Sequence, residues 1–280
     1  MDEKYVLLTG GTNGIGEVAA RELAAHGYRV TIVGRSQERC DATVDRIRRA
    51  TGNVHVDALV GDLSRKSEVE RVAAEARERL PRLDVLVNNA GAVFLDRRET
   101  PDGLERTFAL NHMAYFTLTA HLLDLLKKSA PARVVNVSSR AHFGGELDFG
   151  DLQLARSFSG TRAYSNSKLA NVLFTTELAR RLEGTGVTAN CLHPGVVATN
   201  FGTDNGWKTW IISVGFRVFG ISAEDGARTI VYLASSPQVA DATGGYYYKE
   251  RKAPVSAQAE DAKSAQRLWE VSAQLAGIPA

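Results

Sequence analysis

The 280-residue chain has only two cysteines, Cys40 and Cys191, and they form no CxxC pair or other metal-type spacing. So few thiols are typical of a reducing compartment and argue against a disulfide framework, and we expect both to be inert. The six histidines show neither an HExxH motif nor a paired ligand spacing, so we expect no metal site.

An excess of charge of one sign is also missing. The 34 basic and 32 acidic side chains leave a formal net charge of +2, and no long run of lysine or arginine occurs. This composition argues against a dedicated nucleic-acid binder. We expect small molecules as partners instead.

Long apolar runs are missing as well. The segment 1–9 enters a strand-like run at once, which predicts neither a signal peptide nor an N-terminal anchor. The most apolar late stretch, 207–219, is interrupted by Lys208 and Arg217 and is shorter than the roughly 20 residues of a membrane span. We therefore expect a cytoplasmic protein without a membrane span.

What the chain does have is a regular alternation of short apolar runs and amphipathic segments. Runs rich in Val, Ile and Leu are typical of strands buried on both faces, and the amphipathic segments supply the covering helices. The predicted strands lie at 5–8, 30–33, 54–59, 85–87, 133–137, 187–192 and 246–248, and the helices at 14–26, 37–50, 64–80, 102–126, 162–182 and 223–235. This pattern predicts an α/β fold: one doubly wound Rossmann domain over 1–280, with about seven parallel strands, helices on both faces and a C-terminal helix at about 257–276.

A glycine-rich turn follows the first predicted strand. Glycine permits positive φ and close backbone approach, and the N-terminus of the next helix offers free N–H groups to a pyrophosphate. After the first strand of a βαβ unit, such a turn predicts a dinucleotide site. The residues expected to bind the cofactor here are Gly10, Thr12, Asn13, Gly14, Ile15 and Gly16.

Tyr164 and Lys168 stand four residues apart in a predicted helix, so the phenol and the ammonium share one face. A neighbouring cation favours the phenolate, which predicts a Tyr164 pKa below its ordinary value of about 10 and suits a proton donor. A second pair, Tyr248 and Lys252, lies at a predicted strand, where this spacing does not bring side chains together. We interpret residues 246–248 as sheet-edge packing, with Lys252 exposed.

Six motifs, in order along nearly the whole chain, resemble the short-chain dehydrogenase/reductase family. They are Thr9-Gly10-x-x-x-Gly14-x-Gly16, Asn88-Asn89-Ala90-Gly91, Asn111, Ser138-Ser139, Tyr164-x-x-x-Lys168 and Pro194-Gly195-x-x-x-Thr199. Three further segments are similar to the retinol dehydrogenase and WW-domain oxidoreductase branch, which reduces or oxidises apolar carbonyls and alcohols. These are Asn111-His-Met-Ala-Tyr-Phe116, Ser165-Asn-Ser-Lys-Leu-Ala-Asn171 and Lys263-x-x-x-Arg267-Leu-Trp-Glu270.

The resemblance implies four catalytic residues. In the reductive direction, Ser139 donates a hydrogen bond to the substrate carbonyl oxygen and Tyr164 delivers the proton, while the cofactor gives a hydride to the carbonyl carbon. Lys168 lowers the Tyr164 pKa and binds the nicotinamide ribose. Asn111 holds a water that connects the lysine to solvent.

The adjacent serines leave one assignment open. Ser138 competes with Ser139 for the catalytic role, because His142 stands where sequences of the family often have glycine. We expect His142, the histidine near the inferred pocket, at the surface or in the pocket wall rather than in catalysis.

The end of the second strand, Val33-Gly34-Arg35-Ser36, bears on the cofactor. An NAD enzyme usually has an acid here that holds the ribose 2′-hydroxyl, whereas an arginine pairs with a 2′-phosphate. With Gly34 in the place of the acid and Arg35 after it, we expect NADP(H), with a further phosphate hydrogen bond from Ser36. The alternative is that Arg35 is a solvated surface cation.

The remaining contacts that the resemblance implies lie in loops after the strands. Asp62 and Leu63 are expected on the adenine side, with a helix cap before Ser64 as the alternative. For the segment 88–91 a purely structural polar turn is an equal alternative. The contacts in these later loops are Asn89, Ala90, Gly91, Pro194, Gly195, Val197 and Thr199.

The segment at about 200–220 is expected to form the substrate lid. Its apolar residues are Trp207, Trp210, Ile211, Ile212, Val214, Phe216 and Phe219. Three interpretations compete: a lid over an apolar substrate, a helix in a membrane interface with Lys208 and Arg217 at its polar edge, and ordinary core or subunit contact. The excursion 140–156, with Phe143, Leu147 and Phe149, is expected to form the opposite wall.

Together these features predict an oxidoreductase: an NADPH-dependent carbonyl reductase (ketoreductase) acting on an apolar aldehyde or ketone. An NADP-dependent alcohol dehydrogenase using the same residues oxidatively is one alternative. A catalytically silent dinucleotide sensor is another, and it is disfavoured because a sensor does not need all four catalytic residues. The sequence leaves open the substrate, the direction and whether the protein is a homodimer or a tetramer.

Overall fold

A computed structural model describes residues 3–195 and 221–279 of the chain. The predicted lid at about 200–220 and the predicted cofactor contacts Val197 and Thr199 lie outside the described residues. None of the helices within the described ranges is long and apolar enough to cross a membrane.

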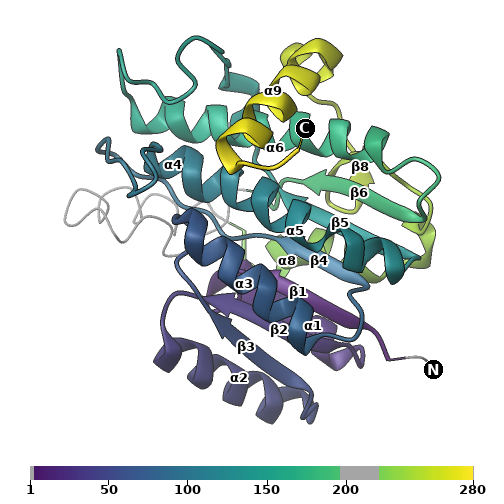
Figure 1. The fold of residues 1–280 in the computed structure, drawn as a ribbon. Coiled ribbons are helices and arrows are strands. Elements are labelled where there is room, and N and C mark those ends of the chain that lie inside the picture. Colours follow the sequence, from purple (N-terminus) through teal and green to yellow (C-terminus); the bar gives the residue numbers. More distant parts are fainter. Residues whose placement is uncertain (1–2, 196–220, 280) are drawn as a thin grey trace.

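Eight strands among the described residues form one sheet, in the order β3-β2-β1-β4-β5-β6-β7-β8 (Figure 1). They are β1 (Tyr5–Thr9), β2 (Arg29–Gly34), β3 (Val56–Val60), β4 (Val85–Asn88), β5 (Ala132–Val137), β6 (Val187–Leu192), β7 (Tyr246–Tyr248) and β8 (Arg251–Lys252). The first seven run parallel, which confirms the predicted doubly wound sheet. The strand order reverses between β1 and β4, and the carboxyl ends of strands at such a reversal are where open α/β sheets bind ligands.

The eighth strand was not predicted. β8 pairs antiparallel with β7 through a two-residue turn at Lys249 and Glu250, whose φ values are 48° and 63°. Positive φ at both positions is the geometry of a tight hairpin turn, and asparagine and glycine usually occupy such positions. Neither residue occurs there, so the sequence carried no hairpin signal.

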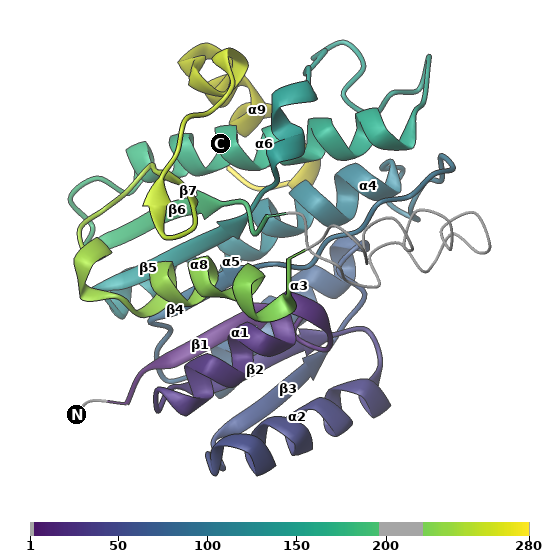
Figure 2. The ribbon, with the colours of Figure 1, turned by 180° about the vertical axis from the view of Figure 1, so that it is seen from behind.

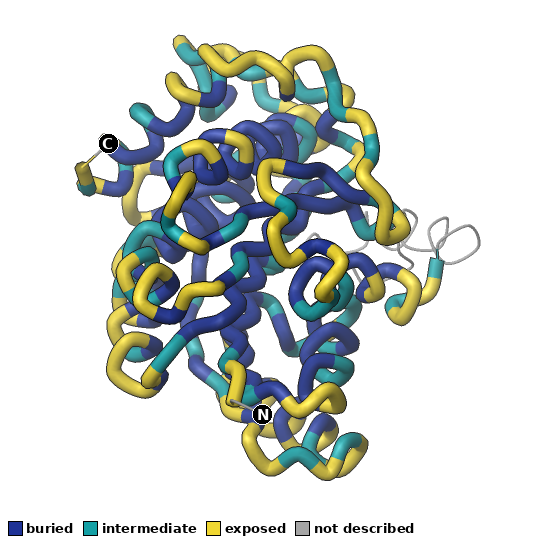
Figure 3. Tube along the Cα trace, turned by 90° about the vertical axis from the view of Figure 1, so that its right-hand side faces the viewer, coloured by how far each residue is buried: buried dark blue, intermediate teal, exposed yellow. Residues whose placement is uncertain are grey.

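Helices cover both faces of the sheet (Figures 1 and 2). Those on one face are α3 (Lys66–Arg79), α5 (Ala114–Lys128) and α6 (Gly160–Arg181), and those on the other are α1 (Gly14–Ala25), α2 (Gln37–Thr51) and α8 (Ala223–Ser235). The strand alternation serves both layers: Leu7 joins the core under α3 and α5, whereas Val6 and Leu8 join the core under α1 and α8. Figure 3 shows the buried chain between the two exposed outer surfaces.

The single helix predicted over 102–126 is wrong. Glu105 accepts hydrogen bonds from the backbone N–H groups of Thr107 and Phe108, so the helical segment begins only at α4 (Arg106–Phe108). A π-helical turn, η1 (Ala109–Met113), then precedes α5. The extra residue of a π-turn redirects the helix face, and such turns are frequent at functional sites.

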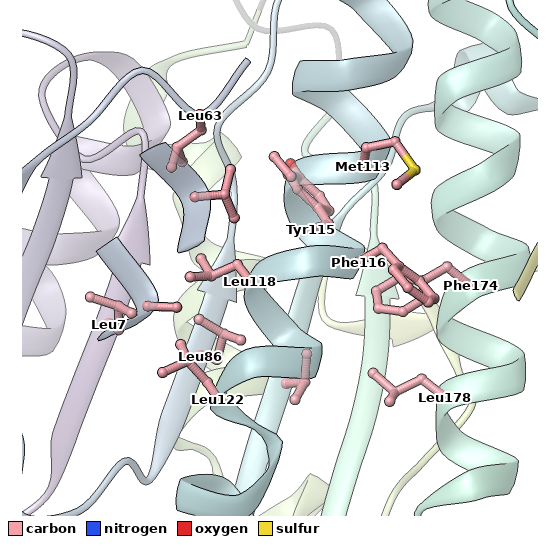
Figure 4. Packing of buried hydrophobic residues seen from close by; sticks show 14 of the residues in the cluster. Leu7, Leu63, Leu86, Met113, Tyr115, Phe116, Leu118, Leu122, Phe174 and Leu178 are labelled. Atoms are coloured by element: carbon pink, nitrogen blue, oxygen red, sulfur yellow. The ribbon is translucent and has the colours of Figure 1, made fainter. Parts of the chain in front are cut away.

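The C-terminal helix α9 (Ala262–Ala276) packs across α5 and α6 (Figure 1). The Trp269 ring lies 4.9 Å from the Phe116 ring and 6.0 Å from the Phe174 ring. Figure 4 shows Phe116 beside Phe174, and Leu118 of α5 directed at the sheet. The helix begins later than the predicted residue 257, because a 3₁₀ turn (Ala257–Glu260) comes first and Asp261 then caps α9.

Two glycines allow the segments on either side of the site to approach α6 closely. A Cβ at Gly160 would lie 2.3 Å from the carbonyl oxygen of Phe94. A Cβ at Gly145, just past the 3₁₀ turn η2 (Arg140–Gly144), would lie 2.7 Å from the carbonyl oxygen of Ser165. A side chain at either position would collide with these backbone atoms, so the two glycines allow α6 and the neighbouring segments to pack this closely.

We expect Gly145→Ala to lower the free energy of unfolding by about 1–3 kcal/mol, because the new methyl group would collide with backbone. The adjacent Gly144→Ala is the matched control: its Cβ would find no neighbour closer than Ser165 Oγ at 4.0 Å, so a change within about 0.5 kcal/mol is expected. Urea denaturation measures both. Equal losses would contradict the close approach.

Candidate active site

The glycine-rich turn connects β1 to α1 at the carboxyl edge of the sheet. Gly10 has a φ of 70°, and a Cβ at Gly16 would lie 2.2 Å from the Gly10 carbonyl oxygen. The first turn of α1 therefore presses against the loop before it. Asn13 precedes α1 and makes no side-chain capping bond, so the helix N-terminus offers its N–H groups to an anion such as a pyrophosphate.

Asn89 holds this turn in place. Its Nδ2 donates to the carbonyl oxygens of Thr9 (2.9 Å) and Gly10 (3.2 Å). In return, Thr9 Oγ1 accepts from the backbone N–H groups of Asn89 (2.9 Å) and Ala90 (3.0 Å). The structural interpretation of the segment after β4 thus has direct support, while its contact with a cofactor stays a prediction.

The end of β2 has no room for an acidic side chain. A Cβ at Gly34 would lie 2.5 Å from Thr12 Cγ2 and 2.7 Å from Cys40 Sγ. An aspartate or glutamate at this position would require both neighbours to move. Arg35, the next residue, is exposed.

Ser36 and Asp62 both take part in local turns. The Ser36 hydroxyl accepts from the backbone N–H of Arg39 at 3.4 Å and caps α2. Asp62 Oδ1 accepts from the backbone N–H (3.1 Å) and the hydroxyl (2.8 Å) of Ser64. Asp62 therefore forms a local turn and is not the cap of α3, which begins after Arg65 without a side-chain capping bond. The Leu63 side chain is buried in the core.

Ser139 and Tyr164 meet although 25 positions separate them in the sequence. Ser139 follows β5 and Tyr164 lies in the first turns of α6. A hydrogen bond with the Ser139 side chain lowers the Tyr164 pKa, but burial outweighs it and raises that pKa to about 12. The Ser138 hydroxyl points elsewhere, donating to the carbonyl oxygen of Lys168 at 2.7 Å while almost fully buried. Of the two serines, Ser139 is thus the one beside Tyr164.

Lys168 is buried next to this pair. Its Nζ donates to the carbonyl oxygen of Val137 at 3.0 Å and lies 5.6 Å from the centre of the Tyr164 ring and 5.8 Å from that of Tyr115. Burial lowers the pKa of Lys168 to about 7. The prediction of a Tyr164 pKa below its ordinary value is wrong for this structure, because burial disfavours the phenolate more strongly than the Ser139 hydrogen bond favours it. That Lys168 itself favours the phenolate stays a prediction.

Asn111 lies in the middle of the π-turn η1 and clamps the loop after β4. Its Oδ1 accepts from the N–H of Ala92 (2.9 Å), and its Nδ2 donates to the carbonyl oxygen of Ala92 (2.9 Å) and to Ser167 Oγ (3.0 Å). Protein groups thus engage both ends of the amide. The predicted water-holding role stays a prediction, and the contacts show a clamp between this loop and α6.

Of the two places expected for His142, the surface and the pocket wall, the structure excludes the surface. The side chain is fully buried and does not lie at the surface. Its Nδ1 lies 2.8 Å from the Ser139 carbonyl oxygen, and its Nε2 accepts from the backbone N–H of Ser256 at 3.2 Å. His142 therefore supports the turn that carries Ser139.

His193 and the tyrosines of β7 are site neighbours that the sequence reasoning missed. The ring of Tyr248 stacks on His193 with centroids 4.0 Å apart, and His193 Nδ1 accepts from the N–H of Gly195 at 3.2 Å. Tyr246 is buried against both His142 and His193. The aromatic triplet is thus more than sheet-edge packing, although Lys252 is exposed as predicted. The sequence feature that could have indicated His193 is its position directly before the Pro194-Gly195 motif.

The predicted wall at 140–156 divides into two parts. Leu147 and Phe149 pack against the core cluster around Leu169 and Leu173 of α6. Phe143 is 50% exposed, two residues after the hydrogen bond between the Ala141 N–H and Ser139 Oγ. Of the three apolar residues expected in this wall, Phe143 is therefore the one with an exposed surface.

Both cysteines are buried free thiols. Burial raises the pKa of Cys40, and it raises the pKa of Cys191 to about 12, so both thiols are protonated at neutral pH. Within residues 3–195 and 221–279, no group of three His, Cys, Asp or Glu side chains is placed to hold a metal ion.

The comparisons with known proteins agree with this geometry. The family model described as "short chain dehydrogenase" matches residues 4–208. Human retinol dehydrogenase 13 is 41% identical over 283 residues, covering 99% of this chain and 86% of that protein. Mouse retinol dehydrogenase 12 is 41% identical over 275 residues, covering 98% and 87%.

Two solved structures extend the likeness to the fold. An uncharacterised protein from Mycobacterium paratuberculosis superposes with a TM-score of 0.80 at 34% identity, covering 99% of this chain and 95% of the other. The Pseudomonas aeruginosa RhlG/NADP active-site complex superposes with a TM-score of 0.68 at 29% identity, covering 87% and 93%.

The buried lysine leads to a prediction about stability. In the unfolded chain Lys168 keeps its proton up to the ordinary pKa of 10.5, whereas in the folded protein it loses the proton near pH 7. Between these values the unfolded state binds more protons, so this residue favours folding more as pH rises, by up to about 1.4 kcal/mol per pH unit. We expect the free energy of unfolding of wild type, minus that of Lys168→Met, to increase between about pH 7 and pH 9.

Urea denaturation at the two pH values measures this difference. Lys252→Met, at an exposed position, is the control and should show no such increase. A difference that stays constant for Lys168→Met as well would mean that the ammonium remains charged in the folded protein across this range.

Proposed function

The chain belongs to the short-chain dehydrogenase family, and from that premise we propose that it is an NADPH-dependent reductase of apolar aldehydes or ketones. The observation that carries the proposal is the meeting of Ser139, Tyr164 and Lys168 at the carboxyl edge of the sheet, beside the glycine-rich turn. The relatives named retinol dehydrogenases support an apolar, retinoid-like carbonyl or alcohol as the substrate class.

The residues present fit a nicotinamide dinucleotide. The N-terminus of α1 would hold the pyrophosphate. Gly16 and Gly91 have no Cβ, so a cofactor could approach the backbone closely at both positions. A Cβ at Gly91 would lie 3.4 Å from Lys168 Nζ, so this loop also borders the lysine. When bound, such a cofactor supplies the hydride for the carbonyl carbon.

The side chains would then manage the charge that develops on the substrate oxygen. Ser139 Oγ donates a hydrogen bond to that oxygen, and Tyr164 Oη delivers the proton. Because burial raises the Tyr164 pKa to about 12, the residue is a phenol at neutral pH. A phenol is the form that reduction needs, whereas oxidation of an alcohol would need the phenolate, so the environment of Tyr164 favours the reductive direction.

Lys168 has two tasks in this proposal. It binds the nicotinamide ribose, and it stands near enough to Tyr164 to stabilise the phenolate left after proton transfer. The hydrogen bond from Lys168 Nζ to the Val137 carbonyl oxygen holds the ammonium group in position. In this assignment Ser138 has a structural role, since its hydroxyl is committed to the backbone of α6.

The preference for NADPH rests on the end of β2. The space at Gly34 is filled by Thr12 and Cys40, so the acid that would hold a ribose 2′-hydroxyl does not fit there. Arg35 is exposed at the same place and can pair with a 2′-phosphate. The structurally similar RhlG/NADP complex is consistent with this preference.

The proposal is tested by mixing the protein with NADPH and a panel of apolar aldehydes and ketones, including retinal, and following cofactor oxidation. We expect turnover by wild type, and Tyr164→Phe should lower kcat on the order of 10² to 10⁴-fold, because the proton donor is lost. Cofactor binding, followed by NADPH fluorescence, should persist.

Tyr248→Phe is the matched control, because the ring that stacks on His193 is retained. Its kcat should stay close to wild type. Tight cofactor binding without turnover of any carbonyl, or of the corresponding alcohols in reverse, would point to a dinucleotide sensor instead.

The cofactor preference has its own test. Arg35→Ala should weaken NADPH binding by about 10- to 100-fold, the worth of one charge-assisted hydrogen bond, and leave NADH binding nearly unchanged. Arg49→Ala removes the same charge from the exposed far end of α2 and should change neither constant. An equal loss for both cofactors in Arg35→Ala would overturn the preference.

A further inference from the structure

Helix α9 reaches the site through a buried hydrogen bond. Ser272 of α9 and His112 of the π-turn η1 are both fully buried, and Ser272 Oγ lies 2.9 Å from His112 Nε2. His112 directly follows Asn111, which clamps the loop after β4. A segment 160 residues away in the sequence is thus joined to the helical turn beside the catalytic groups.

Asn171 continues this connection toward Lys168. It lies on α6, three residues after the lysine, and is fully buried. Its Nδ2 donates to the carbonyl oxygen of Asn111 at 2.9 Å and to that of Val137 at 3.4 Å. The Val137 carbonyl oxygen is also the acceptor for Lys168 Nζ at 3.0 Å. Asn171 and the lysine therefore share one acceptor.

The hydrogen-bond partners of Asn171 determine how its side-chain amide is oriented. Both partners of Asn171 Nδ2 are carbonyl oxygens, which only accept, so the amide orientation is set and Oδ1 is directed the other way. Among the described residues neither Asn171 Oδ1 nor His112 Nδ1 makes a hydrogen bond. His112 is joined to Asn171 through the backbone instead, because it directly follows Asn111, whose carbonyl oxygen accepts from Asn171 Nδ2. Burial lowers the His112 pKa to about 4, so the ring is neutral. The hydrogen bond between His112 Nε2 and the Ser272 hydroxyl is the one that fixes the ring.

We propose that His112 and Ser272 are positioning residues for Lys168: the connection from Ser272 through His112, its neighbour Asn111 and Asn171 to Val137 orients the carbonyl oxygen that holds the lysine. This inference rests on the proposed role of Lys168 in catalysis. Each step of this connection is a buried hydrogen bond or a covalent neighbour, so removing one member loosens the next. Two of the segments that resemble the retinol dehydrogenase branch contain His112 and Asn171, and the third, 263–270, lies in α9 just before Ser272.

A simpler interpretation is that His112 only fills the core. Its ring does lie among Phe108, Phe116 and Phe174, with centroids 5.2, 6.5 and 6.1 Å away. His112→Phe separates the two interpretations, because it keeps an aromatic ring in this cluster and removes only the two nitrogen atoms. Ser272→Ala removes the other end of the connection.

We expect His112→Phe and Ser272→Ala each to lower kcat on the order of tenfold, with the substrate KM little changed, because a misplaced lysine impairs proton transfer more than substrate binding. The double variant should lose no more than the larger single loss, since both changes break the same connection. Thermal unfolding is measured on every variant to confirm that it is folded.

Two controls distinguish positioning from general loosening. His121→Phe makes the same replacement at the other histidine of this helical stretch, on α5, and should leave kcat unchanged. Ser264→Ala removes a hydroxyl from the first turn of α9, where it donates to the cap residue Asp261, and so weakens α9 without touching His112. An equal fall in kcat for Ser264→Ala and Ser272→Ala would overturn the inference, as would unchanged kcat in His112→Phe. Absence of turnover by wild type would instead refute the proposed function.

Discussion

Burial of the Lys168 ammonium is the constraint around which this site is built. A cation taken out of water is costly unless hydrogen bonds replace its hydration, and the described neighbours offer one carbonyl oxygen, that of Val137, between the rings of Tyr115 and Tyr164. That oxygen belongs to the last residue of β5. The end of this strand therefore determines where the lysine stands, and with it the face of α6 that carries Tyr164.

The same burial decides the protonation states of the site. Tyr164 is kept as a phenol and Lys168 gives up its proton near neutral pH, because each group is poorly hydrated. A site that starts with a protonated tyrosine is prepared to donate. The hydrogen bond with Ser139 acts in the opposite direction and is the smaller effect, so local desolvation rather than pairwise attraction dominates the electrostatics.

Much of the fold could be predicted because its signals are local. The seven parallel strands follow from apolar runs, and the turn at Gly10 to Gly16 follows from glycine spacing. The β7–β8 hairpin could not be predicted, since Lys249 and Glu250 adopt a geometry that other residues usually signal. The helix expected from 102 begins later because the Glu105 carboxylate caps it, and the π-turn at Asn111 has no sequence period of its own.

By itself, the sequence determined the doubly wound sheet, the glycine-rich turn and the pairing of Tyr164 with Lys168, because periodicity, glycine spacing and a four-residue helical separation are properties of neighbours along the chain. The resemblance of six motifs added the family, and with it Ser138 or Ser139 as the catalytic serine. Only the tertiary structure decided between Ser138 and Ser139, reversed the expected shift of the Tyr164 pKa, and joined α9 to the site through His112. Each of these depends on which distant segments surround a side chain, and desolvation and hydrogen-bond partners are settled only when those segments pack together.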